Sequence, residues 1–343
     1  MTHGSAQQQG SGEERSPAVG GSPVTVPKLR DHLLQELRDV LPEHRAWTAV
    51  DFPMHLNCGD SALYLGLEAA ARELGARVVR TVDRRSYRPE LLRADALPVC
   101  QAGGNWGGLY PTLHELRLSF LRDTRGRVAV QMPQSIEYVD ERHREELRRA
   151  VGEHGRFIFL VRDRRSYDIA VRDYDCEVRL VPDLALALGN RPRRPARTPL
   201  VVQARTDRET AGAEGFSKTF DWIAAPATSP SSVALRLARR ANAQQRRTAS
   251  PQVALLARSA MRFLAEVNVR RARDLLSAGE VVVTDRLHGH VLCTLLDIPH
   301  VVVDDKFGKI RALYETWTAA ERTSRFAASW ADVQQELAQI PGQ

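Results

Sequence analysis

Short β-rich runs alternate with helical patterns along this chain from residue 27 onward, and this alternation limits its fold more than any other feature. The runs of the first half are WTAVDF (47–52), ARVVRTV (76–82), LPVCQAGG (97–104), RVAVQMP (127–133), RFIFLVRD (156–163) and EVRLVPD (177–183). Helical patterns separate most of these runs, which is the rhythm of βαβ units. The sequence therefore predicts an α/β fold with parallel sheets covered on both faces.

A Pro-rich, basic segment without apolar periodicity, GNRPRRPART, occupies residues 189–198 and predicts a linker between two domains. We expect a Rossmann-like domain over 26–190 and a second over 198–320, facing each other across a central cleft, followed by a C-terminal helix over 321–343. Residues 1–25 are rich in Gly, Ser, Gln and Pro and carry no apolar stretch. They predict a disordered tail rather than a signal peptide.

The charge of the chain is basic and comes almost entirely from arginine, because only four of the 49 Lys and Arg residues are lysine. The formal net charge is +7, which suits anionic ligands or an anionic membrane surface, so peripheral contact with the inner membrane surface is one expectation. No run of 18 apolar residues predicts a transmembrane helix. The four cysteines form no CxxC pair, which predicts reduced thiols and a cytoplasmic protein.

The clearest candidate site is VVVTDRLHGHVLC (281–293), where a strand runs into a helix. Ligands of open parallel sheets bind beyond the carboxyl ends of strands, and a helix N-terminus favours an anion. Arg286 adds a guanidinium suited to phosphate or carboxylate, and His288 can exchange a proton near neutral pH. In the alternative interpretation of this segment, Arg286 forms an ion pair with Asp285 and His288 is a buried core histidine. His288 and His290 are two positions apart and do not share a helix face, so we expect no metal site.

A second candidate is the loop HLNCGDSAL (55–63), which follows the first predicted strand. Gly59 permits close approach of the backbone, and Asn57 and Asp60 offer hydrogen bonds to a ligand. The alternative is an ordinary βα turn in which Asp60 caps the next helix.

A third candidate is the glycine-rich loop QAGGNWGGLYP (101–111), which also follows a strand. Its residues Gly104, Asn105 and Trp106 fit contact with a phosphate or a sugar, because tryptophan stacks on sugar faces. A tight, buried crossover is the alternative for the same segment.

Two further cationic segments follow strands. In LVRDRRSYDIA (160–170), Arg162 stands at the strand exit and Ser166 is expected to cap the next helix, the alternative being a solvated arginine run. Lys306 and Lys309 follow the last long strand and predict a second anion clamp. A surface loop is the alternative for these lysines.

Seven segments between about residues 50 and 320 carry a family likeness through their order and content. They are NCGDSAL, GGNWGGLYP, MPQSIEY, VRDRRSYDIA, VPDLALAL, ARTDRE and VVTDRLHGHVLCTLLDIPHVVVDDKFGKIRALYETW. In these segments the chain resembles the polysaccharide pyruvyl transferases. The resemblance implies a GT-B-like arrangement of the two domains and phosphoenolpyruvate as donor. It also implies that the enzyme forms a pyruvate ketal across two hydroxyls of a sugar in a cell-surface glycan or exopolysaccharide.

The resemblance places the donor at Arg286, Leu287 and His288 and at an arginine of the first half, for which Arg162 is the match by position and Arg205 the rival. Phosphoenolpyruvate carries a phosphate and a carboxylate and so needs two cationic clamps, to which Lys309 would add. His288 would act as general acid and Asp60 as base. The scheme requires no cofactor or metal. The expected acceptor is a sugar or a lipid-linked glycan, and the chain could form a homo-oligomer.

Two other functions fit parts of the sequence. A GT-B glycosyltransferase would use a nucleotide sugar, although no acidic ribose partner follows a glycine loop in the second half. A non-catalytic polyanion binder would explain the charge of +7. We expect no nucleic-acid partner, because the chain lacks a basic helix interleaved with aromatic residues.

Overall fold

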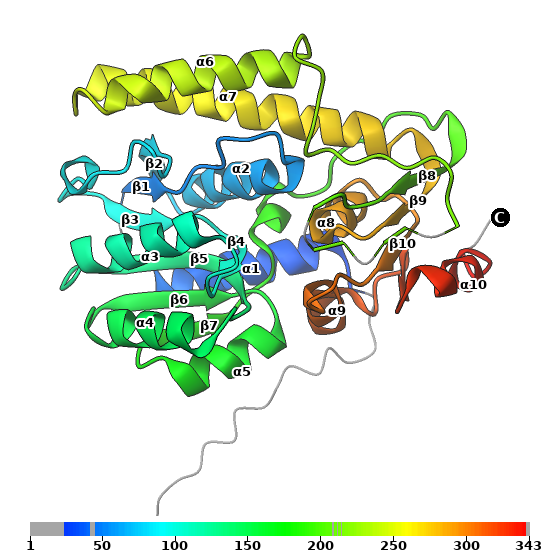
Figure 1. Ribbon diagram of the computed structural model, residues 1–343, viewed down its shortest axis with the longest axis horizontal. Coiled ribbons are helices and arrows are strands. Elements are labelled where there is room, and N and C mark those ends of the chain that lie inside the picture. The colour runs from blue at the N-terminus through cyan, green and yellow to red at the C-terminus, as the bar shows by residue number, and fades with distance from the viewer. Residues whose placement is uncertain (1–23, 42–44, 208, 211, 214, 341–343) are drawn as a thin grey trace, which may run out of the picture.

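The computed structural model describes residues 24–41, 45–207, 209–210, 212–213 and 215–340, which form two parallel β-sheets flanked by helices (Figure 1). The two sheets confirm the predicted α/β class. Most of the segment predicted as a disordered tail, residues 1–25, lies outside the described residues.

The first sheet has the order β2-β1-β3-β5-β6-β7, with β4 paired to β5, and every pairing is parallel. Its strands are β1 (Ala46–Val50), β2 (Arg77–Val82), β3 (Leu97–Cys100), β4 (Gly103–Trp106), β5 (Ala129–Ile136), β6 (Phe157–Val161) and β7 (Glu177–Leu180). Strands β3 and β6 are buried along their whole length, as expected for apolar runs in the middle of a parallel sheet. Strand β5 is buried as well, and its polar side chains Gln131, Gln134 and Ser135 make hydrogen bonds there.

The second sheet has the order β11-β10-β9-β8 and is also parallel throughout. Its strands are β8 (Thr198–Gln203), β9 (Gly279–Thr284), β10 (His300–Val303) and β11 (Ser324–Ala327). Strand β11 lies in the segment 321–343, where the sequence predicts only a helix. That prediction is wrong for this part of the segment, because the residues of β11 pair along the full length of β10.

Ten α-helices cover the two sheets within the described ranges, and none of them is long and apolar enough to cross a membrane. They are α1 (Val26–Val40), α2 (Cys58–Glu73), α3 (Pro111–Asp123), α4 (Glu141–Gly152), α5 (Arg164–Asp173), α6 (Pro230–Gln245), α7 (Pro251–Leu276), α8 (Leu287–Leu295), α9 (Lys309–Leu313) and α10 (Val333–Leu337). Shorter helical turns are η1 (Pro89–Leu91), η2 (Leu184–Leu188), η3 (Tyr314–Thr318) and η4 (Trp330–Asp332).

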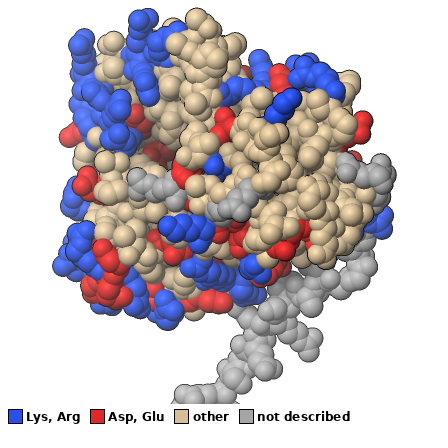
Figure 2. Space-filling view, turned by 45° about the vertical axis from the view of Figure 1, so that its right-hand side comes forward, with Lys and Arg blue, Asp and Glu red and all other residues tan. Residues whose placement is uncertain are grey.

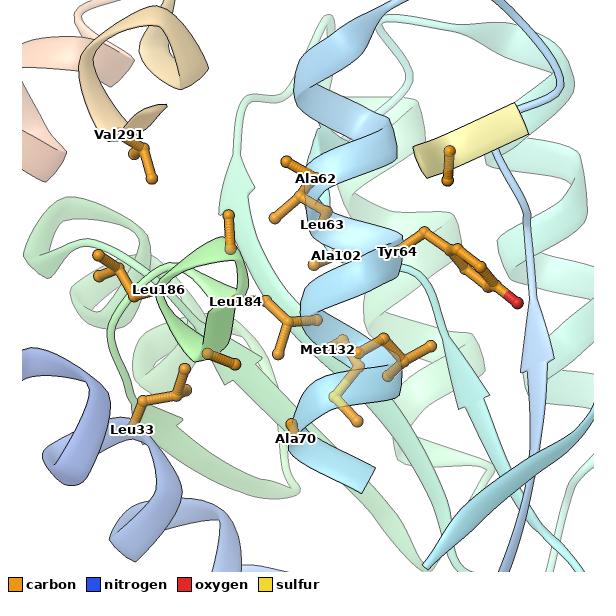
Figure 3. Close-up of a cluster of buried hydrophobic side chains, with 14 of the residues drawn as sticks. Leu33, Ala62, Leu63, Tyr64, Ala70, Ala102, Met132, Leu184, Leu186 and Val291 are labelled. Carbon is orange, nitrogen blue, oxygen red and sulfur yellow. The ribbon is translucent and has the colours of Figure 1, made fainter. Parts of the chain in front are cut away.

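The two faces of the first sheet have separate cores. One face packs against α3, α4 and α5. The other packs against α1, α2 and η2, and this core continues into α7 and α8 of the second half. In Figure 3, side chains from α1 (Leu33), η2 (Leu184 and Leu186), β5 (Met132) and α8 (Val291) gather around α2. Helix α2 therefore connects the two halves of the molecule.

The hairpin of α6 and α7 belongs to the second half by sequence but packs on the first half. Helix α7 lies against α2 and β2, and α6 lies on the outer side of α7 (Figure 1). Asn242 donates a hydrogen bond to the Asp83 carboxylate at 2.6 Å, and Arg80 donates one to Gln245 at 3.1 Å. The chain thus crosses back over the first sheet between β8 and β9.

Two helix caps differ from the expected ones. Asn57, not Asp60, caps α2, since its side chain accepts a hydrogen bond from the Gly59 backbone N–H at 3.1 Å. Asp163, not Ser166, caps α5, because its carboxylate accepts from the Ser166 N–H at 2.7 Å. In both cases the residue that stands just before the helix is the cap, and the expected one lies in the first turn.

Candidate functional site

A pocket of about 500 Å³ lies between the two sheets at the carboxyl ends of their strands. Seven strands are each followed, one or two positions later, by a polar or charged lining residue. These residues include Asp51, Asp83, Gln101, Arg162, Arg205, Arg286 and Asp305, after β1, β2, β3, β6, β8, β9 and β10. This is where open parallel sheets bind ligands. Of the candidate residues from the sequence, Asn57, Asp60, Gly104, Asn105, Arg162, Arg286, Leu287, His288 and Lys309 line this pocket.

Arg286 caps the N-terminal end of α8 and is 4% exposed. Its Nε and Nη2 donate to the two carboxylate oxygens of Asp221, both at 2.6 Å, and Nη2 also donates to Asp207 at 3.0 Å. Among the described residues nothing accepts from its Nη1. The alternative that Arg286 pairs with Asp285 is wrong, because Asp285 instead accepts from the Arg205 backbone N–H at 2.7 Å.

Arg162 and His288 meet at the buried carboxylate of Asp183. Nη1 of Arg162 donates to Asp183 at 2.8 Å, and Nε2 of His288 lies 3.4 Å from both Asp183 and Arg162. Burial would raise the pKa of Asp183, but the charges of His288 and Arg162 outweigh it and hold this pKa well below its usual range. Arg162 is 3% exposed, so it is not part of a solvated arginine run, unlike the exposed Arg164 and Arg165.

A second cationic group lies on the side of the pocket formed by the second half. Nζ of Lys309 donates to Glu209, and Arg205 pairs with Glu209 at 3.1 Å and with Asp207 at 2.9 Å. Burial would raise the pKa of Asp207, but Arg205 and Arg286 together hold it at about 2. Lys309 is 5% exposed, so the surface-loop alternative is wrong for it, whereas Lys306 is exposed.

Two glycines allow the loops of the first half to reach these cations. A Cβ on Gly59 would lie 2.6 Å from Cβ and Nδ1 of His288. A Cβ on Gly104 would lie 3.0 Å from Nη2 of Arg162 and 3.6 Å from Cδ of Lys309. Gly59 needs to be glycine because the His288 side chain occupies the space that a Cβ would take, and a Cβ on Gly104 would make a tight contact with Arg162.

Asp60 lies at the rim of the pocket in the first turn of α2. Its carboxylate accepts from Nδ2 of Asn57 at 2.8 Å and lies 3.6 Å from Nε2 of His55. Asp60 is partly exposed and His55 more so, which leaves both accessible to a ligand. An acidic and an imidazole group of the first half therefore line the pocket together with the cations.

The glycine-rich loop forms strand β4, and its two polar candidates have different positions. Asn105 lines the pocket, where its side-chain oxygen accepts from Arg117 at 3.1 Å and from Gln134 at 3.0 Å. Trp106 points into the core instead, is 1% exposed and donates from Nε1 to the Tyr174 hydroxyl at 2.8 Å. The prediction that Trp106 contacts a sugar is therefore wrong, since its ring packs among other buried aromatic side chains.

Sequence reasoning missed most of the acidic residues of the pocket. Asp51 has a positive φ of 71°, and its buried carboxylate accepts from Arg117 at 2.8 Å. Burial raises the pKa of Asp51, and this effect outweighs the opposing charge of Arg117. Asp51 and Asp183 each follow an apolar run, so the signal that selected Arg162 could have found them as well.

The arrangement fits a small, multiply charged anion. Three arginines, a lysine and a histidine converge from both halves, and acidic residues keep each cation in place before a ligand arrives. Buried guanidinium groups held by carboxylates form a pre-organised site for phosphate or carboxylate oxygens. His288, among these cations, is placed to exchange a proton with the bound anion.

Comparison with known proteins agrees with this picture. The chain is 29% identical over 78% of its length to "Pyruvyl transferase 1" of Schizosaccharomyces pombe, of which it covers 68%. It is 26% identical over 85% of its length to "Putative pyruvyl transferase EpsO" of Bacillus subtilis, of which it covers 91%. A crystal structure of a functionally uncharacterised protein from Klebsiella pneumoniae shares the fold, with a TM-score of 0.55, 17% identity, and coverage of 88% of this chain and 98% of the other.

The model of one protein family, described as polysaccharide pyruvyl transferase, matches residues 57–306. The match includes the pocket residues from Asn57 to Asp305 and both sheets apart from β1 and β11. The chain belongs to the polysaccharide pyruvyl transferase family.

Proposed function

We propose that this protein transfers the pyruvyl unit of phosphoenolpyruvate to two hydroxyls of one sugar in a cell-surface glycan or exopolysaccharide, in the cytoplasm. The products are a cyclic pyruvate ketal and inorganic phosphate. The observation that carries this proposal is the convergence of Arg162, Arg286, His288 and Lys309 on one pocket between the two sheets. In this proposal the two halves, 26–190 and 198–320, form a GT-B-like pair with the acceptor on the first and the donor on the second.

The donor would bind between the two buried arginines. Nη1 of Arg286 and Nη2 of Arg162 are the guanidinium nitrogens that no described residue engages. Phosphoenolpyruvate presents a phosphate at one end and a carboxylate at the other, so each arginine would bind one anionic group. Lys309 lies beside Gly104 and Arg162 and would add a third positive charge.

His288 is proposed as the general acid. Proton transfer from His288 to the methylene carbon makes the adjacent carbon electrophilic, and a sugar hydroxyl forms a C–O bond there. A second hydroxyl of the sugar then forms the other C–O bond as the phosphate leaves with the C–O bonding electrons. Asp183 is a positioning residue in this scheme, because it holds Arg162 and His288 in one fixed arrangement.

Asp60 is proposed as the base that accepts the proton of the attacking hydroxyl, with His55 and Asn57 fixing its carboxylate. Of the two hydroxyl protons released per turnover, one restores the proton that His288 donates and the other leaves with the phosphate. The acceptor sugar would lie against the first half, where the Gly59 and Gly104 loops and Asn105 border the pocket. This leaves the donor deeper in the pocket and the acceptor nearer its rim.

The test measures phosphate release from phosphoenolpyruvate across a panel of glycosides, with mass spectrometry of the sugar product. We expect phosphate release that depends on the glycoside and a product that has gained one pyruvyl group. His288→Gln should lower turnover by about 10²–10⁴-fold with an unchanged melting temperature.

Three outcomes would count against this function. They are native-like turnover of His288→Gln, phosphate release without modification of the sugar, and thermal stabilisation by nucleotides but not by phosphoenolpyruvate. The last outcome would favour a glycosyltransferase that uses a nucleotide sugar.

A further inference from the structure

The hairpin of α6 and α7 accounts for the net positive charge of the chain. Between Pro230 and Leu276 there are ten arginines and only two acidic residues, Glu266 and Asp274, which gives a formal charge of +8. The entire chain carries +7, so the remainder is close to neutral. The basic character of the protein is therefore a local property of one surface layer. Figure 2 shows Lys and Arg side chains beside uncharged surface at the top of the molecule, where this hairpin lies.

The same hairpin exposes most of the large apolar side chains found on the surface. The described residues include eight large hydrophobic side chains that are exposed, and five of them lie on α6 and α7. These five are Val233, Leu237, Leu255, Leu256 and Phe263, which are 39–58% exposed. The opposite side of α7 already packs into the core through Ala257, Met261 and Leu264. The five exposed side chains lie outside this core, and exposed apolar side chains gathered on one surface indicate an interaction site.

The apolar and basic side chains share the solvent-facing stripe of each helix. On α6 the stripe has the spacing i, i+3, i+4, i+7 and consists of Val233, Arg236, Leu237 and Arg240. On α7 the stripe spans two turns and consists of Leu255, Leu256, Arg262 and Phe263. Among the described residues, the side chains of Arg240, Arg246 and Arg247 make no hydrogen bond or ion pair. Arg246 and Arg247 lie just beyond the end of α6, and Arg262 on α7 pairs with Glu68 and Glu266. Surface helices rich in arginine that also expose leucine and phenylalanine have the composition of helices that lie in the headgroup region of a bilayer.

We propose that the α6–α7 hairpin docks the protein on an anionic lipid bilayer. The apolar side chains would enter the bilayer between the headgroups while the arginines bind lipid phosphates. A second copy of this chain is disfavoured as the occupant, because an isologous contact would bring +8 against +8. Nucleic acid is disfavoured because Val, Leu and Phe on the stripe have no role in binding phosphates.

The α6–α7 hairpin also contacts the rim of the pocket, so docking of the hairpin would affect where the pocket lies relative to the bilayer. Arg271 of α7 donates to the carbonyl of Leu56 at 2.7 Å, and Leu56 lies in the loop that forms the pocket rim. Ile223, which leads into α6, lines the pocket and is 36% exposed. Docking would therefore hold the rim close to the bilayer, where a glycan carried on a lipid is presented. This last step rests on the proposed function, whereas the docking itself does not.

The test is flotation of the full chain with vesicles of phosphatidylcholine containing phosphatidylglycerol, against vesicles of phosphatidylcholine alone. Two triple variants remove the two components of the surface: Arg240→Gln, Arg246→Gln and Arg247→Gln in one, and Leu255→Gln, Leu256→Gln and Phe263→Gln in the other. We expect the native chain to bind only the anionic vesicles at physiological salt. Each triple variant should lower binding by about 10-fold or more.

Matched controls remove the same chemistry elsewhere on the surface. Arg142→Gln, Arg148→Gln and Arg149→Gln remove three charges from α4, and Val139→Gln with Val171→Gln removes the exposed apolar side chains of the first half. Both controls should bind like the native chain. All of these variants should release phosphate normally with a soluble glycoside, which separates docking from catalysis.

Failure of the native chain to bind anionic vesicles would overturn the proposal. So would equal losses in the controls, or binding that the apolar triple leaves unchanged and that soluble DNA displaces. Concentration-dependent dimerisation that the apolar triple abolishes, without vesicle binding, would assign the surface to a second copy instead.

Discussion

Gly59 and His288 come from opposite halves of the chain and lie against each other beside the pocket. Because a Cβ on Gly59 would lie 2.6 Å from the histidine ring, Gly59→Ala should push His288 away from Asp183. We expect turnover to fall by about 10²-fold or more, since a 1 Å misplacement of a catalytic group can cost that much. Steady-state phosphate release measures the effect.

Gly152→Ala is the matched control for this substitution. Gly152 ends α4, and a Cβ there would meet nothing within 4 Å. Normal turnover in Gly59→Ala would show that the contact with His288 does not position the histidine.

The carboxyl group of Asp285 is buried directly before Arg286. Burial raises its pKa to about 6, although Arg205 and Arg286 oppose the shift. A raised folded-state pKa means that the native protein binds the proton more tightly than the unfolded chain does, so stability is lost as the pH rises from about 4 to about 6. Asp285→Asn cannot lose a proton and should gain stability relative to the native protein across this range, by up to about 3 kcal/mol above pH 6.

Urea denaturation of both proteins at several pH values between 4 and 7 measures this difference. Constant ionic strength keeps the screening of other charges the same. A free-energy difference that does not change with pH would contradict the assignment of the shifted carboxyl group to Asp285.

Sequence reasoning located the cations of the pocket better than their partners. Arg162, Arg286 and Lys309 each follow a strand, and position relative to a strand can be read from apolar runs. Partners such as Asp221, which follows no predicted strand, depend on which chain segments meet in space, and a single sequence does not reveal this. Trp106 was misplaced for a related reason, because glycine-rich loops can direct an aromatic side chain inward as easily as outward.

At the scale of single elements, the N-terminal end of α5 connects the stability of this helix to Arg162 of the proposed donor site. Asp163 caps α5 and also accepts from the Ser135 hydroxyl at 2.7 Å, and that hydroxyl accepts from Nε of Arg162 at 2.9 Å. Asp163→Ala should therefore cost about 1 kcal/mol of stability and raise KM for phosphoenolpyruvate. Urea denaturation and initial rates measure the two effects.

Asp140→Ala is the matched control, because Asp140 caps α4 through the His143 N–H at 2.9 Å and does not line the pocket. It should cost about the same stability and leave KM unchanged. Equal KM values for the two variants would show that the hydrogen bonds from Asp163 through Ser135 do not position Arg162.

The elements themselves were mostly predictable, because apolar runs and helical periodicity are local signals. The strands β1 to β3, β5 to β7, β9 and β10 and the helices α2 and α8 occur where the sequence predicts such elements. Strand β11 was missed because its four residues, SRFA, include only two apolar side chains. What makes them a strand is the neighbouring edge of β10, which is information from tertiary structure.

At the scale of the whole molecule, the α6–α7 hairpin and helix α2 join the two halves. We expect calorimetric unfolding to show one transition, since neither half keeps a complete core without the other. Equality of the calorimetric and van't Hoff enthalpies measures this cooperativity. Two resolved transitions would mean that the two halves unfold independently.

The crossing of the hairpin over the first sheet also sets a rule for recombining members of this family. In a hybrid joined at residues 189–198, the α6–α7 hairpin of one parent would pack on α2 and β2 of the other parent. Contacts across this boundary, such as the hydrogen bond from Asn242 to Asp83, would then join residues of two different sequences. Such hybrids should keep 230–276 with the parent that supplies 46–82. Exchange of whole halves between members of this family therefore requires three splice points rather than one.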